Sequence, residues 1–399
     1  MKRILFVDDD LAVLRGLERV LRAYGDQWKC VFIGNPAEAL DLIGTGWPDA
    51  VVSDMRMPRI DGIEVLAKAR ADRPDCARLI LSGEVGTGAL LPLLAVAHQC
   101  IGKPCKADLL VRILTRLLIS DDSGTSAKLN EKLRGLLGLP VMPTRHRELS
   151  EALNAAPVER EAKVLQALSR SPAMTSKILQ AAGCVRLGSA QGVASLTDAI
   201  RLLGPETIAA LINSDSCRPM SEVDIDLTRR RIWREGAAAT AVARAIATVE
   251  QCAPEVAAQA VLLTVLSGAG TILLDATWHE DYVSMLAEAE TEARDRTVPE
   301  LERDRFGVSS AEAAARLFRL WGIHDPTVDL VATLDDAGKQ TTGTLGPSGI
   351  AHIAKALVRM RPGTGLQPDS LDYLVRLGLV DRLPAWEKLA ELQSEPEPC

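Results

Sequence analysis

The chain has 399 residues, of which 47% are hydrophobic and 25% charged, and its net charge is −7. This length exceeds what one hydrophobic core usually organises, so we expect two or three domains. The acidic balance offers no general basic surface for nucleic acid or anionic lipid, which argues against both as partners.

The first third of the chain alternates short apolar runs with segments of helical period. This alternation is typical of a parallel sheet covered by helices on both faces, an α/β architecture. The predicted strands are residues 3–7, 30–33, 50–53, 78–81 and 99–101. The predicted helices are residues 11–24, 36–43, 62–70, 87–97 and 106–118.

A polar run at residues 120–126 follows, and we place the domain boundary there. A short amphipathic segment at 129–137 leads into a second part that has helical period almost throughout, which predicts an all-α bundle. The most apolar stretch, 261–274, is shorter than the ~20 residues that span a bilayer, so we expect a buried helix. Residues 394–399 form an acidic tail.

The eight cysteines are scattered without a close-paired framework, which favours reduced thiols in a cytoplasmic protein. No Cys-x-x-Cys motif occurs, so we expect no structural zinc. Acidic residues begin at Asp8, too early for a signal peptide. We therefore expect a cytoplasmic location and no membrane span.

Polar side chains follow four of the predicted strands. Asp8 and Asp9 come after the first strand, Asp54 after the third, Ser82 after the fourth and Lys103 after the fifth. The carboxyl ends of parallel strands meet at one edge of a sheet, where ligands bind. Carboxylates, a hydroxyl and an ammonium at that edge are the groups needed to phosphorylate an aspartate beside a divalent cation.

With these motifs in order, residues 1–119 resemble the receiver domain of a two-component response regulator. The resemblance implies a flavodoxin-like (βα)5 fold with strand order 2-1-3-4-5. It also implies that Asp54 accepts a phosphoryl group from a histidine kinase or phosphotransfer protein. Mg²⁺ would be held by Asp8, Asp9, Asp54 and the backbone carbonyl of Arg56.

The same resemblance assigns the remaining roles. Lys103 would pair with the acyl phosphate, Ser82 would turn toward it, and the Lys103-Pro104 peptide would be cis. Receivers usually carry Tyr or Phe three residues before this lysine, but here the residue is Cys100. The helix around 89–97 is apolar on most faces, so we expect it to contribute to a dimer or to docking of the second domain.

Residues 139–393 resemble the HDOD family, a helical output domain related to metal-dependent HD phosphohydrolases, with 120–138 as a linker containing a short helix. The landmarks are Leu139-Pro140-x-x-Pro143, Ser195-x-x-Asp198 through Gly204, and Trp233-Arg234. Where relatives carry His or His-Asp ligands, this chain has Glu235, Ser267-Gly268 and Ser310. The five His residues are isolated in the sequence, so each is expected to be a surface or packing residue.

The sequence thus favours a response regulator whose catalytically inert HDOD domain binds a downstream protein. Two alternatives stay open: a metal-dependent phosphodiesterase acting on a cyclic dinucleotide, and a nucleotide- or RNA-binding output module using the Arg-rich face around 229–234. Segments 294–305 and 376–382 carry charges of both signs and are expected to be solvated helix faces.

Overall fold

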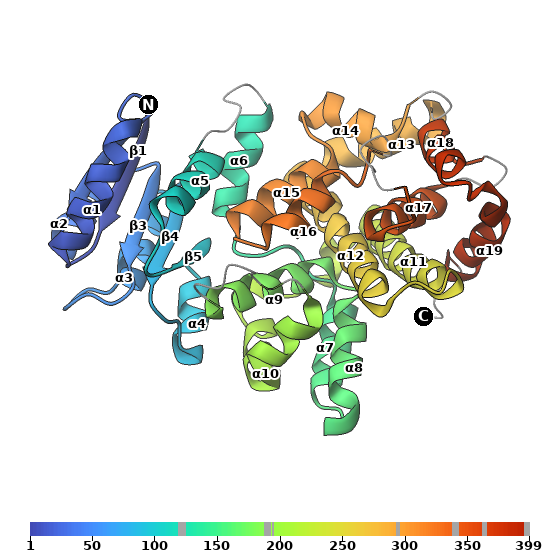
Figure 1. Ribbon diagram of the computed structural model, residues 1–399, viewed down its shortest axis with the longest axis horizontal. Coiled ribbons are helices and arrows are strands. Elements are labelled where there is room, and N and C mark those ends of the chain that lie inside the picture. Colours follow the sequence, from blue (N-terminus) through green and yellow to red (C-terminus); the bar gives the residue numbers. More distant parts are fainter. Residues whose placement is uncertain are drawn as a thin grey trace.

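The computed structural model describes residues 1–118, 125–186, 193, 195–292, 296–336, 343–360 and 365–394. A sheet with its helices forms one end of the molecule and a helical bundle forms the other (Figure 1). The predicted linker lies partly outside the described residues, as does the acidic tail beyond Ser394.

The sheet is parallel throughout and has the order β2-β1-β3-β4-β5, as expected. Strands β3 and β4 are buried along their whole length, which explains their continuous apolar sequences. The strands are β1 (Lys2–Val7), β2 (Trp28–Ile33), β3 (Ala50–Asp54), β4 (Ala77–Ser82) and β5 (Gln99–Gly102).

Helices connect the strands at the predicted places. Because α1 contacts α5 and α2 contacts α3, the helices form two groups that cover the sheet. The helices are α1 (Leu11–Leu21), α2 (Pro36–Gly44), α3 (Gly62–Asp72), α4 (Thr87–Leu94) and α5 (Ala107–Leu118), with a 3-10 turn at Arg22–Tyr24.

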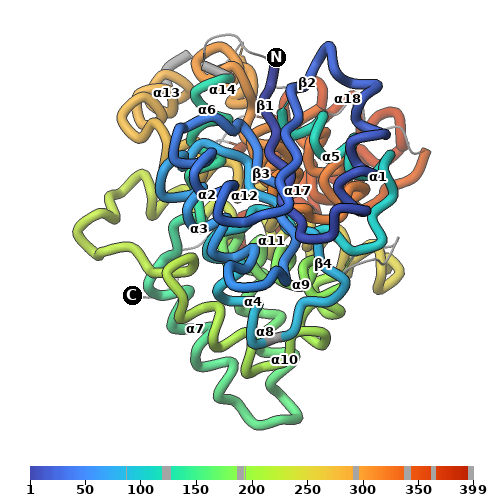
Figure 2. The backbone as a smooth tube through the Cα atoms, turned by 90° about the vertical axis from the view of Figure 1, so that its left-hand side faces the viewer, coloured from blue at the N-terminus to red at the C-terminus, as the bar shows by residue number. Residues whose placement is uncertain are grey.

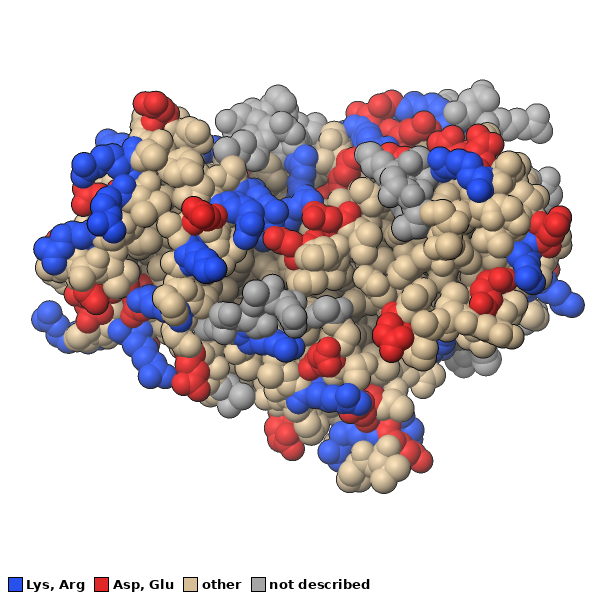
Figure 3. All heavy atoms as spheres, in the orientation of Figure 1, with Lys and Arg blue, Asp and Glu red and all other residues tan. Residues whose placement is uncertain are grey.

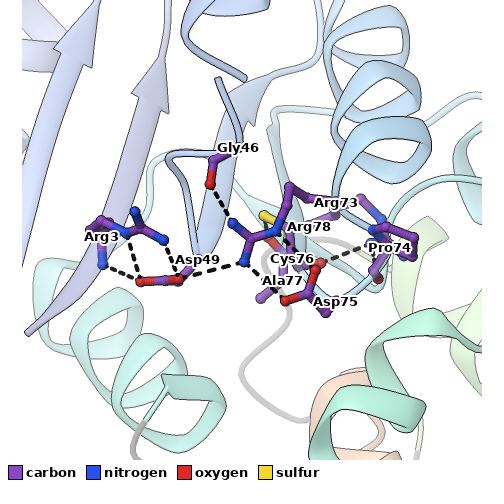
Figure 4. A network of polar contacts seen from close by, with 9 residues as sticks. All are labelled: Arg3, Gly46, Asp49, Arg73, Pro74, Asp75, Cys76, Ala77 and Arg78. Atoms are coloured by element: carbon purple, nitrogen blue, oxygen red, sulfur yellow. Dashed lines mark hydrogen bonds and ion pairs between the residues drawn. The ribbon is translucent and has the colours of Figure 1, made fainter. Parts of the chain in front are cut away.

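A network of charged side chains closes the amino-terminal edge of the sheet (Figure 4). Asp49, just before β3, accepts hydrogen bonds from the backbone and side chain of Arg3 and pairs with Arg73. Arg73 also pairs with Asp75 at 2.9 Å and donates to the carbonyl of Gly46. This edge fixes the ends of β1, β3 and β4, and it lies opposite the edge that carries Asp54.

Arg78 is the most deeply buried charge of the sheet, with 1% exposure. Its guanidinium donates to the carbonyls of Val96 and Cys76, and to that of Arg134 at 3.0 Å. Arg134 belongs to α6 (Thr125–Gly135), the short helix predicted within the linker. Arg78 therefore attaches this helix to the sheet, although burial lowers its pKa to about 10.

The second part of the chain is helical, as expected. Gly204 interrupts α10 with a positive φ of 72°, a conformation that glycine adopts readily. The first helices of the bundle are α7 (Pro143–Leu153), α8 (Pro157–Leu168), α9 (Pro172–Val185), α10 (Leu196–Ile212), α11 (Leu227–Val249) and α12 (Pro254–Thr277). The later ones are α13 (His279–Glu292), α14 (Val298–Phe306), α15 (Ser310–Leu320), α16 (Asp325–Ala332), α17 (Pro347–Arg359), α18 (Pro368–Leu377) and α19 (Leu383–Ser394).

Helix α12 is the centre of the bundle. It packs against α9, α11, α15 and α17, which confirms the predicted buried helix. The prediction that this apolar stretch is too short to span a bilayer was wrong. The helix that contains it has 24 residues and is, by length and composition, long and apolar enough to span one. Its most apolar window is 61% buried within the described bundle, as expected of a core helix.

The two parts of the chain share one hydrophobic core. Buried apolar residues of the sheet, of α4 and of α9 belong to a single continuous cluster. A separate cluster joins the end of α11 to α17, α18 and α19, with Trp386 and Tyr373 fully buried in it. The molecule is therefore not two independently packed domains on a linker, and Figure 2 shows the sheet directly in front of the bundle helices.

Candidate functional site

Two buried carboxylates lie at the carboxyl edge of the sheet. Asp8 follows β1 and Asp54 ends β3, and the register pairs Val7 with Ser53. The side chain of Asp8 accepts a hydrogen bond from the backbone of Asp10 at 2.9 Å, and that of Asp54 accepts one from the backbone of Arg56 at 2.8 Å. Local backbone amides therefore orient both carboxylates.

Lys103 brings the two carboxylates together. Its ammonium lies 2.7 Å from Asp8 and also contacts Asp54. The Lys103-Pro104 peptide is cis, as predicted. Burial alone would lower the pKa of Lys103, but hydrogen bonds to Asp54 and Asp8 outweigh it, so the pKa is raised. The ammonium thus stays charged at neutral pH, as a group that pairs with an acyl phosphate must.

The other predicted residues are placed differently. Ser82 is buried at the end of β4, and its hydroxyl donates to the carbonyl of Glu84 at 2.7 Å rather than toward Asp54. Asp9 is exposed beside the site. Asp10, the third residue of the acidic run, caps α1 by accepting from the backbone of Ala12.

The donor set at this edge suits magnesium. Mg²⁺ usually takes one or two carboxylates in proteins and keeps several waters. Asp8 and Asp54 are two such carboxylates, held close enough to share one ammonium. Among the described residues, no three His, Cys, Asp or Glu side chains form a cluster that could hold a metal on their own. Binding by Asp9 and by the carbonyl of Arg56 stays a prediction.

The bundle covers the side of the receiver formed by β5, α4 and α5. Helix α4 packs on α9 and α10, β5 packs on α9, and α5 packs on α15. The predicted docking of the apolar helix against the second domain is therefore confirmed. Arg116 of α5 also pairs with Asp325 of α16 at 2.6 Å.

Polar groups of α9 hold this interface. Lys177 is 1% exposed, donates to the carbonyl of Leu137 at 2.7 Å and reaches that of Leu94 at 3.5 Å. Its ammonium also lies 5.5 Å from the centre of the Trp321 ring. Gln180 donates to the carbonyl of His98 at 2.8 Å. Both partners Leu94 and His98 flank the connection between α4 and β5.

A disulfide also crosses the interface. Cys100 of β5 is bonded to Cys184 of α9, 84 residues away in the sequence. The prediction that the cysteines are reduced was wrong for this pair; Cys30, Cys76, Cys105, Cys217 and Cys252 are free. Cys100 occupies the position at which receivers usually carry an aromatic residue, so the residue that departs from the pattern is covalently bonded to the bundle.

The positions of the missing HD ligands are only partly brought together. Glu235 of α11 and Ser267 and Gly268 of α12 line one small cavity. Ser310 lies apart from that cavity and is fully buried, with its backbone amide donating to the carboxylate of Glu302 at 2.6 Å.

The prediction that segment 294–305 is a solvated helix face was wrong for Glu302. Its side chain is 0% exposed and accepts a hydrogen bond from the hydroxyl of Tyr282 at 2.8 Å. Burial raises the pKa of Glu302. In a short segment with charges of both signs, the sequence alone does not show which carboxyl group is buried and which are exposed.

Comparison with known families agrees with both parts. The family model for the response regulator receiver domain matches residues 4–115, and that for the HDOD domain matches residues 139–337. The chain is a response regulator with an N-terminal receiver domain and a C-terminal HDOD domain. Receiver domains bind Mg²⁺ in their active site, which fits the carboxylate pair described above.

Individual relatives match mainly the receiver. The response regulator MprA of Mycolicibacterium vanbaalenii is 39% identical over 130 residues, 31% of this chain and 55% of its own length. The chain therefore spans about half the length of this curated relative.

Two solved structures extend into the bundle. A virulence factor of Campylobacter jejuni is 17% identical with a TM-score of 0.50, covering 69% of this chain and 98% of that one. The MmoQ response regulator of Methylococcus capsulatus is 24% identical with a TM-score of 0.45, covering 62% and 97%. At such identity the first likeness concerns the fold alone, and the second score is too low to support an argument.

Proposed function

We propose that phosphorylation of Asp54 by a histidine kinase or phosphotransfer protein loosens the packing of the receiver on the HDOD bundle, which then binds a downstream protein. The observation that carries this proposal is the docking of α9 and α10 on α4 and β5. In the sequence, α4 comes after Ser82 and β5 ends directly before Lys103.

The phosphotransfer chemistry follows from the carboxyl edge. A carboxylate oxygen of Asp54 attacks the phosphorus of a phosphohistidine, and the bond from phosphorus to the imidazole nitrogen breaks in the same in-line step. The electron pair of that bond leaves with the imidazole. A bound Mg²⁺ supplies charge neutralisation for the incoming phosphoryl oxygens. Lys103, already between the two carboxylates, pairs with the phosphoryl group once it is attached.

Ser82 provides the mechanical link to α4. Its hydroxyl now donates to the carbonyl of Glu84, in the loop that leads to α4. Turning this hydroxyl toward an acyl phosphate at Asp54 breaks that bond and frees the loop. Because α4 packs on α9 and α10, a shift of the loop acts on the interface.

Strand β5 offers a second route. Ser82 pairs with Gly102 in the sheet, and Ile80 pairs with Cys100. Cys100 is bonded to α9, and the side chain of Gln99 packs closely against Gly322, the residue after the α15 C-cap. Movement of β5 relative to β4 is therefore transmitted directly to the bundle.

We propose that the HDOD domain acts by binding and not by hydrolysis. Glu235 is the one potential metal ligand among the HD positions, since Ser267, Gly268 and Ser310 cannot hold a divalent ion with useful strength. Two of the four arginines on the face proposed for RNA are neutralised, because Arg229 pairs with Asp275 at 2.9 Å and Arg231 with Glu235 at 2.6 Å. Basic and acidic side chains are also intermixed over the face in Figure 3.

Affinity capture with the beryllofluoride-treated chain tests the proposal. We expect a protein partner that is retained by this form and not by untreated chain or by Asp54→Asn treated in the same way. Capture that is equal for all three samples would contradict control by phosphorylation. Metal-dependent hydrolysis of cyclic di-GMP by the purified full-length chain would contradict the proposal that the HDOD domain acts without hydrolysis.

A further inference from the structure

The HDOD bundle contains a large cavity on the side away from the receiver. It lies between α11, α13, α14, α17 and α18, which occupy the right-hand part of Figure 1. Its volume is about 910 Å³. Sites for small organic ligands usually have about 300–1,000 Å³, so the cavity has room for a molecule as large as a nucleotide.

Several of the charges that line the cavity are paired with each other. Lys355 lies 2.7 Å from Asp335, and both side chains are buried. Burial raises the pKa of Asp335, but Lys355 and Arg359 outweigh it and lower the pKa to about 2. Arg231 pairs with Glu235 and with Glu290. These pairs leave little net charge from the residues concerned.

Arg359, at the end of α17, is the exception. Across the part of the chain that the structure describes, its guanidinium makes no hydrogen bond and no ion pair. Burial tends to lower its pKa, but the carboxylates of Asp335 and Glu302 outweigh burial and raise it, so the group stays charged. A half-buried guanidinium has five N–H donors that need acceptors, and a phosphate oxyanion matches their planar arrangement.

Hydroxyl groups also line the cavity. Thr271 of α12 and Ser370 of α18 both line it, and Ser370 is within 2.9 Å of the imidazole of His352. Apolar side chains of Leu286, Val298 and Leu366 line other parts of the wall. A lining that combines polar and apolar side chains suits a ligand that carries a phosphate and an organic moiety.

The same arginine excludes a metal at this place. Arg359, Lys355 and Thr271 also line the small cavity that contains Glu235 and Ser267. A divalent cation there would lie beside the guanidinium of Arg359, whose charge would repel it. An anion would be attracted by this guanidinium.

We propose that the cavity binds an organic phosphate of nucleotide size, with its phosphate on Arg359, and does not hydrolyse it. This ligand site is independent of phosphorylation at Asp54, and it gives the HDOD domain a second input. The phosphate accepts hydrogen bonds from the guanidinium of Arg359 and the hydroxyl of Thr271. The organic moiety packs on the apolar wall.

Isothermal titration calorimetry of the full chain in EDTA tests the proposal, with ATP, AMP, cyclic di-GMP and inorganic phosphate as separate probes. We expect at least one organic phosphate to bind saturably with one site per chain. Arg359→Gln should raise its Kd by about tenfold or more, the loss expected of a charge-assisted contact. Arg382→Gln, on a side chain that is 58% exposed outside the cavity, is the matched control and should leave the Kd unchanged.

Arg359→Gln removes a charge near buried carboxylates, so its helical content is checked by circular dichroism. If that variant does not fold, Thr271→Val serves instead and should weaken binding about threefold or more while keeping the fold. Absence of saturable binding of every organic probe below about 1 mM would overturn the proposal. So would equal affinity in the cavity variant, or inorganic phosphate binding as tightly as the organic probes. Labelling of Asp54 by acetyl phosphate in the same samples reports separately on the receiver.

Discussion

Replacement of Lys177 by Met tests the interface through the pH dependence of stability. Lys177 is buried between α9, α4 and the Trp321 ring, and burial lowers its pKa from the ordinary 10.5 to about 8. The unfolded chain therefore binds more protons than the folded chain between pH 8 and 10.5. Stability contributed by this residue must rise with pH across that window.

The magnitude follows from the two pKa values. A difference of one pH unit corresponds to about 1.4 kcal/mol, so the full window corresponds to about 3 kcal/mol. Between pH 7 and 9.5 the free energy of unfolding of the wild type should gain about 2 kcal/mol relative to Lys177→Met. Near pH 7 the free energies of unfolding of the two proteins should differ less. The variant loses hydrogen bonds, but it also no longer buries a charge.

Urea unfolding followed by circular dichroism at several pH values measures this difference, and the variant itself supplies the background from all other groups. Lys163→Met is a matched control, because Lys163 is 52% exposed and pairs with Glu159 at the surface of α8. It should show no such gain. A difference between wild type and Lys177→Met that stays constant from pH 7 to 9.5 would refute the burial of this ammonium at the interface.

Three further predictions concern the core and the switch. Cys184→Ser opens a link between residues 84 apart and should lower the free energy of unfolding by about 4 kcal/mol in the chain-entropy account; equal urea midpoints for the variant and the oxidised wild type would contradict the link. Arg78→Met leaves the carbonyls of Val96 and Cys76 without their donor and should cost about 2 kcal/mol by the same assay, whereas an unchanged midpoint would show that the buried guanidinium contributes nothing net. Lys103→Ala should keep Mg²⁺ affinity, measured by titration of intrinsic fluorescence, but lose the response to beryllofluoride; an intact response would remove the role given to this ammonium.

The receiver was predictable from the sequence because each of its signals is local. Apolar runs that are buried on both faces define the strands, and chemistry-bearing residues follow them directly. The parallel order then brings Asp8, Asp54 and Lys103 to one edge. The orientation of the Ser82 hydroxyl was not predictable, because it depends on a hydrogen bond to the carbonyl of Glu84 in the loop.

How the receiver and the helical bundle contact each other was harder to predict from the sequence. An apolar α4 indicated a covered surface, but its sequence does not say what covers it. Cys100 and Cys184 are separated by 84 residues and share no motif, so only the packing of β5 on α9 brings them together. The cavity around Arg359 likewise collects residues from helices distant in the sequence.

Hydrogen exchange of the full chain with and without beryllofluoride and Mg²⁺ tests the central claim most directly. If phosphorylation loosens the docked bundle, peptides from α4 and α9 should exchange faster in the treated protein, and Asp54→Asn should show no change. The response should be larger in Cys184→Ser, which lacks the covalent link. Unchanged exchange in α9, together with protection around Asp54 that shows the site to be filled, would contradict the account.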